Sequence, residues 1–166
     1  MSFAPNILEK IARARADLRM GVPVVVEGKD QAILIAAAET LTEQKLADFR
    51  ALGEELALTI TSRRAETLKA RVYDGDIARI GVPTEVGTRW IQCVADPADD
   101  MMMPMKGPLA VFRKGDASLH RTAVKLVKAA QLLPAVLVQS IENAAEFSAT
   151  NGLTNIPSEL ADAALA

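Results

Sequence analysis

The sequence has one cysteine, Cys93, and one histidine, His120, among its 166 residues. A single cysteine excludes an internal disulfide framework and a zinc site built from several thiolates within the chain. With a single histidine, any Ser-His-Asp or Cys-His catalysis would have to use His120. The low cysteine content favours a reducing compartment, and we expect the cytoplasm.

Long apolar runs and an excess of one charge are also missing. No run approaches the roughly 20 apolar residues of a membrane-spanning helix. The first 21 residues contain acidic side chains and lack the continuous apolar region of a signal peptide. The 19 basic and 21 acidic side chains give a net charge of −2, which offers no electrostatic footprint for nucleic acid or an anionic membrane. We expect neither as a partner.

Apolar residues make up 50% of the chain, enough for a sizeable core, and the length predicts a single domain over residues 1–166. Periodicity alternates between helix-like and strand-like segments. The predicted helices are residues 7 to about 20, 42–52, 63–70 with Ser62 as cap, 118–131, and short ones after Asn143 and Pro157. The predicted strands are residues 22–27, 32–37, 55–61, 90–95, 109–112 and 135–141.

Residues 73–87 and 96–108 are rich in Gly, Pro and Asp and are predicted to be loops. The helix over 118–131 is predicted to bury one apolar face. That face contains Leu119, Ala123, Leu126, Val127 and Ala130. The whole alternation predicts an α+β protein in which a mixed sheet is covered by helices.

Few residues suggest catalysis. His120 lies near the start of an amphipathic helix with no nucleophile specified beside it, so we interpret it as a solvated surface histidine. Cys93 lies in an apolar segment predicted to be a strand, which favours a small core residue over a reactive thiol. Arg63 and Arg64 stand at a predicted helix N-terminus and could meet a phosphate beside the exposed amides there.

Two segments have weak metal-binding character. Asp96, Asp99 and Asp100 have loop spacing that could hold Mg²⁺ or Ca²⁺, but they lack the Gly and terminal Glu of a calcium loop, which favours solvation. The segment "MMMPM" at 101–105 supplies four methionines. They could form an adaptable surface or copper ligands, but no Cys or His accompanies them, which favours packing.

Four segments occur in an order that resembles a known enzyme family. They read "MGVPVVVEGKD", "ILIAAAETLT", "LALTITSRRAETL" and "GPLAVFRKGDASLHRTAVKLVKAAQLLPAVLV". Over most of residues 6–156 the chain resembles 3,4-dihydroxy-2-butanone-4-phosphate synthase, most specifically at 107–138. It is most similar to the degenerate form of this domain on the N-terminal side of some bacterial GTP cyclohydrolase II proteins. The tail "ENAAEFSATNGLTNIPSELADAAL" is similar to the end of that domain.

The resemblance implies a fold, a reaction and an assembly. The fold would be a three-layer α-β-α arrangement with a mixed sheet. An active synthase converts ribulose 5-phosphate to dihydroxybutanone phosphate and formate, using Mg²⁺ held by acidic residues and acid–base groups. The family forms homodimers with substrate sites near the subunit interface, so we expect a homodimer.

The chain departs from the family at its chemical motifs. The family's loop Asp-Asp-Glu-x-Arg-Glu-Asn-Glu-Gly-Asp is reduced here to Glu27, Gly28, Lys29, Asp30 and Gln31. That loop is too short to wrap a metal-bound sugar phosphate, so it mainly turns the chain.

Three further departures agree with this loss. The family's Gly-His-Thr-Glu motif becomes "SLHRTA", where His120 is one position out of register. The glutamate expected after the Pro-Ala strand falls at Ser140, with Glu142 two residues beyond. The middle stretch rich in Ser, Asp, Arg and Thr, which binds substrate in the family, is replaced by a shorter segment. We therefore expect no catalytic residues, no metal and no cofactor.

Two function classes follow. The first is a catalytically silent riboflavin-pathway module that supports folding, dimerisation or regulation of a fused or separate GTP cyclohydrolase II. The alternative is an active synthase that uses Mg²⁺, with Glu27, Asp30, His120 and Glu142 as candidate catalytic residues. GTP cyclohydrolase chemistry within this chain is disfavoured, because that family holds zinc with three thiolates.

Overall fold

A computed structural model describes residues 2–103 and 107–166. These residues form a seven-stranded sheet in the order β5-β4-β3-β6-β2-β1-β7. Neighbouring strands are antiparallel except β1 and β7, which are parallel, so the sheet is mixed as predicted. The strands are β1 (Val24–Glu27), β2 (Ala32–Ala37), β3 (Ala57–Thr61), β4 (Ile77–Gly81), β5 (Val111–Phe112), β6 (Ala135–Ile141) and β7 (Asn155–Pro157).

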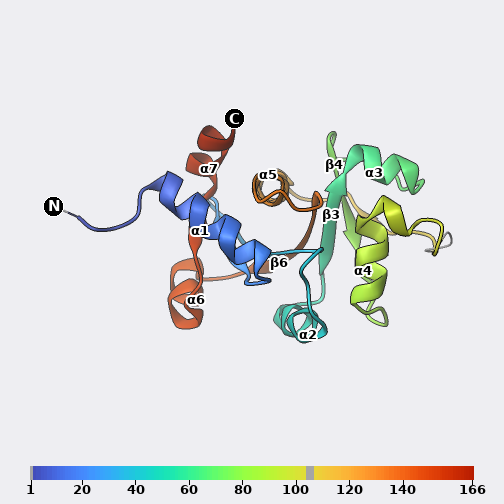
Figure 1. The fold of residues 1–166 in the computed structure, drawn as a ribbon, viewed down its shortest axis with the longest axis horizontal. Helices are drawn as coiled ribbons and strands as arrows, with labels where there is room; N and C mark the ends of the chain where they lie inside the picture. Colours follow the sequence, from blue (N-terminus) through green and yellow to red (C-terminus); the bar gives the residue numbers. More distant parts are fainter. Residues whose placement is uncertain (1, 104–106) are drawn as a thin grey trace.

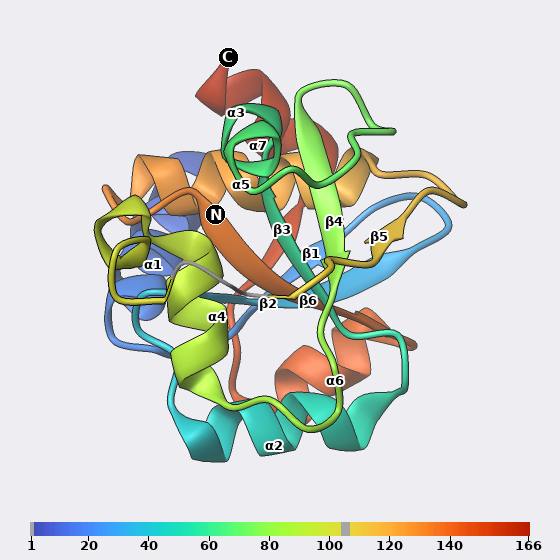
Figure 2. The same cartoon turned by 90° about the vertical axis from the view of Figure 1, so that its right-hand side faces the viewer.

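Helices cover both faces of the sheet, which confirms the three-layer arrangement. The helices are α1 (Ile7–Arg19), α2 (Glu43–Leu52), α3 (Ser62–Thr67), α4 (Thr88–Ala95), α5 (Ser118–Ala129), α6 (Ala144–Asn151) and α7 (Ser158–Leu165). Buried residues of α1, α5 and α7 form one core cluster, and those of α2, α3, α4 and α6 form the other. Figure 2 shows α5 and α7 above the central strands, with α2 and α6 below (Figures 1 and 2). In the part of the chain that the structure describes, every helix is too short or too polar to cross a bilayer.

The long helix α5 anchors one of the two cores. The five residues predicted to form its buried face are all buried, which confirms the periodicity of this segment. The central strand β6 lies between β3 and β2 and is buried on both faces from residue 135 to 139. A strand covered on both sides has a continuous apolar run instead of alternation, which is why "AVLV" could be recognised in the sequence.

The first helix begins and ends at local signals that the sequence contains. Asn6 caps it by accepting a hydrogen bond from the Glu9 backbone, and the Glu9 side chain accepts one from the Asn6 backbone. The helix ends before Gly21, whose φ of 79° lies in the left-handed region. A Cβ atom at Gly21 would lie 2.9 Å from the Thr40 carbonyl oxygen, so glycine is required there for space as well.

Two middle segments differ from the prediction. Residues 77–81, predicted to be part of a loop, form strand β4. Its apolar signal was missed in the sequence because Arg79 interrupts the segment and Gly, Asp and Pro residues flank it. Residues 90–95, predicted to be a strand, belong to α4. Ile91, Val94 and Ala95 share the buried side of this helix, and six residues were too few to separate helical from strand periodicity.

Smaller corrections concern the ends of elements. The cap of α3 is Thr61, whose hydroxyl accepts from the Arg64 backbone at 3.2 Å, and not Ser62 as predicted. The strand predicted over 109–112 is limited to Val111 and Phe112. The short edge strand β7 was not predicted, since its three residues carry no periodic signal.

The burial of α5 predicts the effect of a core truncation. Leu126 is 0% exposed, so Leu126→Ala should lower the free energy of unfolding by about 2–5 kcal/mol through lost contacts and a cavity. Leu8, on α1, is 66% exposed, and Leu8→Ala should change it by less than about 0.5 kcal/mol. Urea unfolding of both variants measures the difference. Equal effects would contradict the placement of α5.

Candidate functional site

A cavity of about 560 Å³ opens where the N-terminal turn of α5 meets the strands β3, β4, β5 and β6. We call it the His120 cavity. Its polar lining includes Gln31, Glu55, Arg79, Asp116, His120 and Ser140. Gln31 directly precedes β2, and Ser140 lies near the end of β6 opposite Ile33. Three positions that are far apart in the sequence, in the β1–β2 loop, in α5 and in β6, therefore line one cavity.

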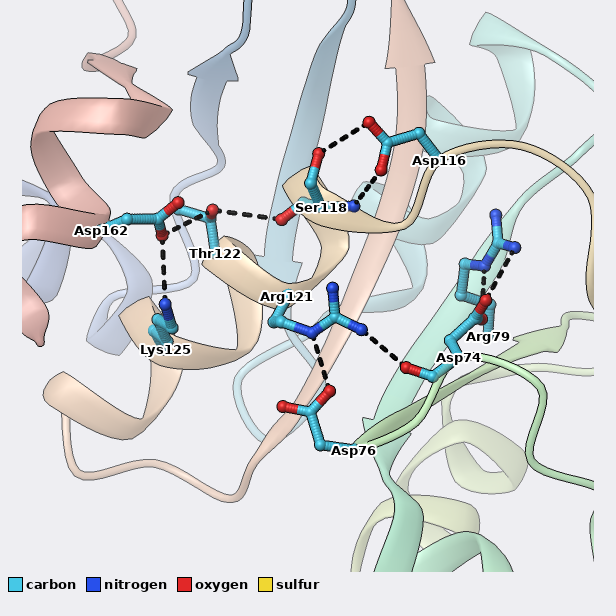
Figure 3. Close-up of polar contacts among 9 residues, drawn as sticks. All are labelled: Asp74, Asp76, Arg79, Asp116, Ser118, Arg121, Thr122, Lys125 and Asp162. Atoms are coloured by element: carbon cyan, nitrogen blue, oxygen red, sulfur yellow. Dashed lines mark hydrogen bonds and ion pairs between the residues drawn. The ribbon is translucent and has the colours of Figure 1, made fainter.

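The turn before β4 is tied to both β4 and α5 by arginines. Arg79, on β4 and 6% exposed, donates through Nε to Asp74 at 2.9 Å and through Nη2 to its other carboxylate oxygen at 3.3 Å. Arg121 of α5 donates to Asp76 at 2.7 Å and to the Asp74 carbonyl at 2.6 Å (Figure 3). The hydrogen bond from Arg121 lowers the pKa of Asp76. These contacts fix the position of α5 relative to β4, and with it one wall of the cavity.

The start of α5 is organised by Asp116. Its carboxylate accepts hydrogen bonds from the Ser118 backbone at 2.9 Å and from the Ser118 hydroxyl at 3.0 Å (Figure 3). These two hydrogen bonds, the backbone one foremost, hold the pKa of Asp116 below its ordinary value. Asp116 is thus an ionised group at the cavity rim, with both oxygens engaged by the helix that it begins.

His120 is largely enclosed, which contradicts its prediction as a solvated surface histidine. Its Nδ1 atom is buried and has no hydrogen-bond partner among the described residues. Burial is the main cause that lowers the pKa of His120 to about 4, and the positive charge of Arg79 adds to it. The negative charges of Asp74 and Asp116 offset this only in part. The first turn of α5 packs against the strands and thereby buries the imidazole. With its pKa lowered to about 4, the imidazole is neutral at pH 7.

The rim of the His120 cavity carries charges of both signs, with cations as well as the carboxylates of Glu55 and Asp116. Arg113 and Lys114 are exposed side chains that line it, in addition to the buried Arg79. The Arg113 guanidinium lies 5.7 Å from the centroid of the Tyr73 ring, a cation–π distance. Arg79 was not recognised as a site residue in the sequence, because residues 77–81 were predicted to be a loop. The residues 113 and 114 alone had no spacing that marks a site.

The four candidate catalytic residues are divided between two cavities. Glu27, Asp30 and Glu142 line a neighbouring cavity of about 440 Å³, while His120 lines its own. Gln31 lines both, so the two cavities share a boundary. Glu27 accepts a hydrogen bond of 3.0 Å from the Asn155 amide. The three carboxylates and the imidazole thus do not line a common cavity.

The two phosphate candidates at the start of α3 have different surroundings. Arg64 is 7% exposed and donates to the Val94 carbonyl at 2.8 Å and to the Cys93 carbonyl at 3.1 Å. It also forms a bidentate pair with Asp100, at 2.7 and 2.8 Å. Arg64 therefore holds the C-terminal end of α4. Arg63 is exposed and lines a different groove.

Cys93, on α4, is fully buried, as predicted for a small core residue. The predicted aspartates have local partners. Asp96 accepts from the Ala98 backbone at 2.9 Å, and Asp99 lies 3.6 Å from Arg89. Of the methionines, Met101 and Met102 are 92% and 78% exposed, so neither fills the core. Pro104 and Met105 lie outside the described residues.

A magnesium site of the kind that the resemblance implies does not fit the residues present. Within residues 2–103 and 107–166, no three His, Cys, Asp or Glu side chains gather where they could hold a metal ion. In the His120 cavity, Ser140 stands where the resemblance implies a glutamate, and Gln31 is the loop residue at the cavity wall. Both are neutral, and Mg²⁺ is usually bound through carboxylates. The cavity is lined by two carboxylates, Glu55 and Asp116, and both oxygens of Asp116 already accept hydrogen bonds from Ser118.

The architecture described above is that of 3,4-dihydroxy-2-butanone 4-phosphate synthase. The enzyme from Candida albicans superposes with a TM-score of 0.70 and 18% identity, over 94% of this chain and 97% of that one. A magnesium-bound structure of such a synthase gives a TM-score of 0.65 at 16% identity, over 90% of this chain and 93% of that one. The fold implied by the sequence resemblance is thereby confirmed.

A third similar structure is longer than this chain. It is a two-domain 3,4-dihydroxy-2-butanone 4-phosphate synthase from A. baumannii, with a TM-score of 0.63 and 16% identity. The match covers 90% of this chain but only 56% of that one. No protein-family model and no curated protein matches the sequence.

The depressed pKa of His120 predicts a pH-dependent stability. In the unfolded chain the imidazole binds its proton near pH 6.5, but in the folded chain it does so only near pH 4. The unfolded state therefore binds more protons than the folded state between these pH values. As a result, the titration of His120 leaves the free energy of unfolding unchanged above pH 6.5 and lowers it as the pH falls toward 4. The loss at pH 4 should be about 3 kcal/mol.

Unfolding in urea at pH 7 and at pH 4 measures this effect, with His120→Gln as the matched variant. The carboxylates titrate in both proteins, so the difference between them isolates His120. Wild type should lose more stability than His120→Gln on acidification. Parallel pH profiles would contradict the burial of the imidazole.

Proposed function

We propose that the chain is a catalytically silent module of riboflavin biosynthesis that retains the synthase fold. The observation that carries this proposal is that Gln31, His120 and Ser140 line the same cavity. In the sequence, the loop containing Gln31, the histidine motif and the Ser140 position each depart from the synthase pattern. Their meeting at one cavity means that these departures affect one site.

The physical chemistry of the cavity supports a loss of catalysis. Enolisation of a sugar phosphate needs a base whose pKa lies near the working pH. The imidazole of His120, with a pKa of about 4, is too weak a base to be effective at pH 7. The carboxylates Glu27, Asp30 and Glu142 line the neighbouring cavity. Of the two carboxylates that line the His120 cavity, Glu55 and Asp116, the latter already accepts hydrogen bonds from Ser118 on both oxygens. This lining supports a loss of acid–base chemistry and of Mg²⁺ binding.

The role that we propose for the module is to support a GTP cyclohydrolase II, fused or separate, through folding, dimerisation or regulation. The two-domain A. baumannii synthase supports this role, since this fold there forms part of a longer chain. The sequence resemblance to the degenerate domain of cyclohydrolase proteins supports it further. We also propose that the module forms a homodimer, as the synthase family does.

An active synthase is the second candidate, and one observation favours it. The His120 cavity has a volume within the usual range for small-molecule sites, and Arg79, Arg113 and Lys114 could attract a sugar phosphate. In this case His120 would act with shifted acidic residues, and Mg²⁺ would be required. The two candidates differ in a single measurable product, formate.

We expect no formate release when the purified chain is incubated with ribulose 5-phosphate and Mg²⁺. Each misplaced acid–base group typically costs about 10²–10⁴ in rate, and loss of the metal site lowers the rate further. The rate should therefore be at least about 10⁴-fold below that of an authentic synthase assayed alongside. Formate can be followed with a coupled formate dehydrogenase.

The variants His120→Ala and Glu27→Gln serve as controls for contaminating synthase. A trace of formate that persists unchanged in both variants comes from a contaminant. Formate release that disappears in either variant would overturn the silent-module proposal and make the chain an enzyme.

A further inference from the structure

A second cavity of about 560 Å³ lies between α3, the start of β4 and the length of α5. We call it the Arg63 groove, and its charged lining residues are Arg63, Asp76, Arg121, Lys125 and Lys128. It shares no lining residue with the His120 cavity. The sequence marked only Arg63 of these residues as a phosphate candidate, and the proposed function assigns the groove no role.

The groove is positively charged because one face of α5 carries cations. Arg121, Lys125 and Lys128 are spaced by four and three residues, which places them on one side of the helix. Arg63 approaches from α3. Four cations thus line a groove that contains a single carboxylate, Asp76.

These cations differ in how far their charge is already compensated. Arg121 forms an ion pair of 2.7 Å with Asp76, and Lys125 lies 3.4 Å from Asp162 of α7 (Figure 3). Arg63 and Lys128 form no ion pair with any of the described residues. Lys128 is close enough to Asp76 to help lower the pKa of that carboxyl group, but Asp76 already pairs directly with Arg121. The positive charges of the groove therefore outnumber its negative charge.

Apart from Thr61 and Ser62, the uncharged lining of the groove is apolar and packs against the core. Ile77 and Val124 belong to the core, at 2% and 4% exposed, and Pro134 completes the apolar lining. The Ser62 backbone donates to the Asp76 carbonyl at 2.8 Å, which links α3 to the start of β4. The charged side chains are thus attached to fixed backbone, and only their ends need to be ordered when a ligand binds.

We propose that the Arg63 groove binds a phosphate-bearing anion with at least two negative charges. Arg63 and Lys128 supply exposed positive charges that form no direct ion pair with a described residue, and Arg121 offers its remaining N–H groups from a position fixed by Asp76. Charge-assisted hydrogen bonds of this kind are the strongest in proteins, and guanidinium groups match the geometry of phosphate oxygens. The volume exceeds what a lone orthophosphate needs, so a diphosphate or a phosphate ester fits the groove better.

This proposal does not depend on whether the chain has synthase activity, because the His120 cavity contributes no residue to the groove. The test uses the full chain and isothermal titration calorimetry at low ionic strength. The probes are inorganic pyrophosphate, ribose 5-phosphate as a phosphate monoester, and orthophosphate. Sodium sulfate serves as an anion without phosphate.

The site variant is the double substitution Arg63→Ala with Lys128→Ala, which removes the two exposed cations of the groove. The matched control is Arg13→Ala with Arg71→Ala, which removes two exposed cations that line neither the groove nor the His120 cavity. Both change the net charge by the same amount. Thermal unfolding without ligand checks that both variants fold.

Saturable binding of pyrophosphate or ribose 5-phosphate is expected in the wild type, tighter than that of sulfate. The Kd should rise at least about tenfold in the groove variant, from the loss of two charged contacts, and less than about twofold in the control. Tighter binding of pyrophosphate would indicate a diphosphate ligand, and tighter binding of ribose 5-phosphate would indicate a phosphate ester. Absent binding, equal binding of sulfate, or a larger loss in the control variant would overturn the proposal.

Discussion

The contacts between α5 and the turn before β4 position the helix that lines the two larger cavities described above. Arg79 is paired with Asp74, and their side chains are 7% and 10% exposed. Arg121 joins α5 to the same turn through Asp76 and the Asp74 carbonyl. Breaking a buried ion pair by removing one partner typically costs about 3–5 kcal/mol. The network therefore fixes α5 against the sheet, and α5 lines both the His120 cavity and the Arg63 groove.

This constraint does not depend on which catalytic groups line the cavity. The position of α5 depends on its apolar face and on arginine contacts at its first turns. None of these contacts requires a catalytic group in the cavity. Replacement of acidic residues in a surface loop, or of a glutamate at the end of β6 by Ser140, leaves the core contacts intact. The architecture, which matches the synthases, therefore does not require a catalytic group among the residues that line the cavity.

The sequence predicted the architecture where the apolar signal was long or continuous. The twelve residues of α5 and the apolar run of β6 were recognised for this reason. The segments that contain Arg79 and Cys93 were assigned wrongly, since each is short and its neighbours include turn-forming residues. The resemblance supplied the correct fold in spite of these local errors.

The candidate site was predicted less well than the fold. The burial of His120 could not be read from helical spacing, because its position at the first turn of α5 depends on how that turn meets the strands. Arg79 was missed along with its strand. The groove at Arg63 depends on an approach of α3 to α5, which are separated by about 50 residues in the sequence. Such contacts arise only from the tertiary fold.

The silent-module proposal requires that the His120 cavity does not hold the metal on which synthase chemistry depends. Paramagnetic broadening by Mn²⁺, a substitute for Mg²⁺, tests this directly in amide NMR spectra recorded with ribulose 5-phosphate present. The account predicts that the His120 and Ser140 amide signals broaden no more than those of exposed backbone elsewhere. Saturable broadening centred on these two residues and reversed by excess Mg²⁺ would contradict it.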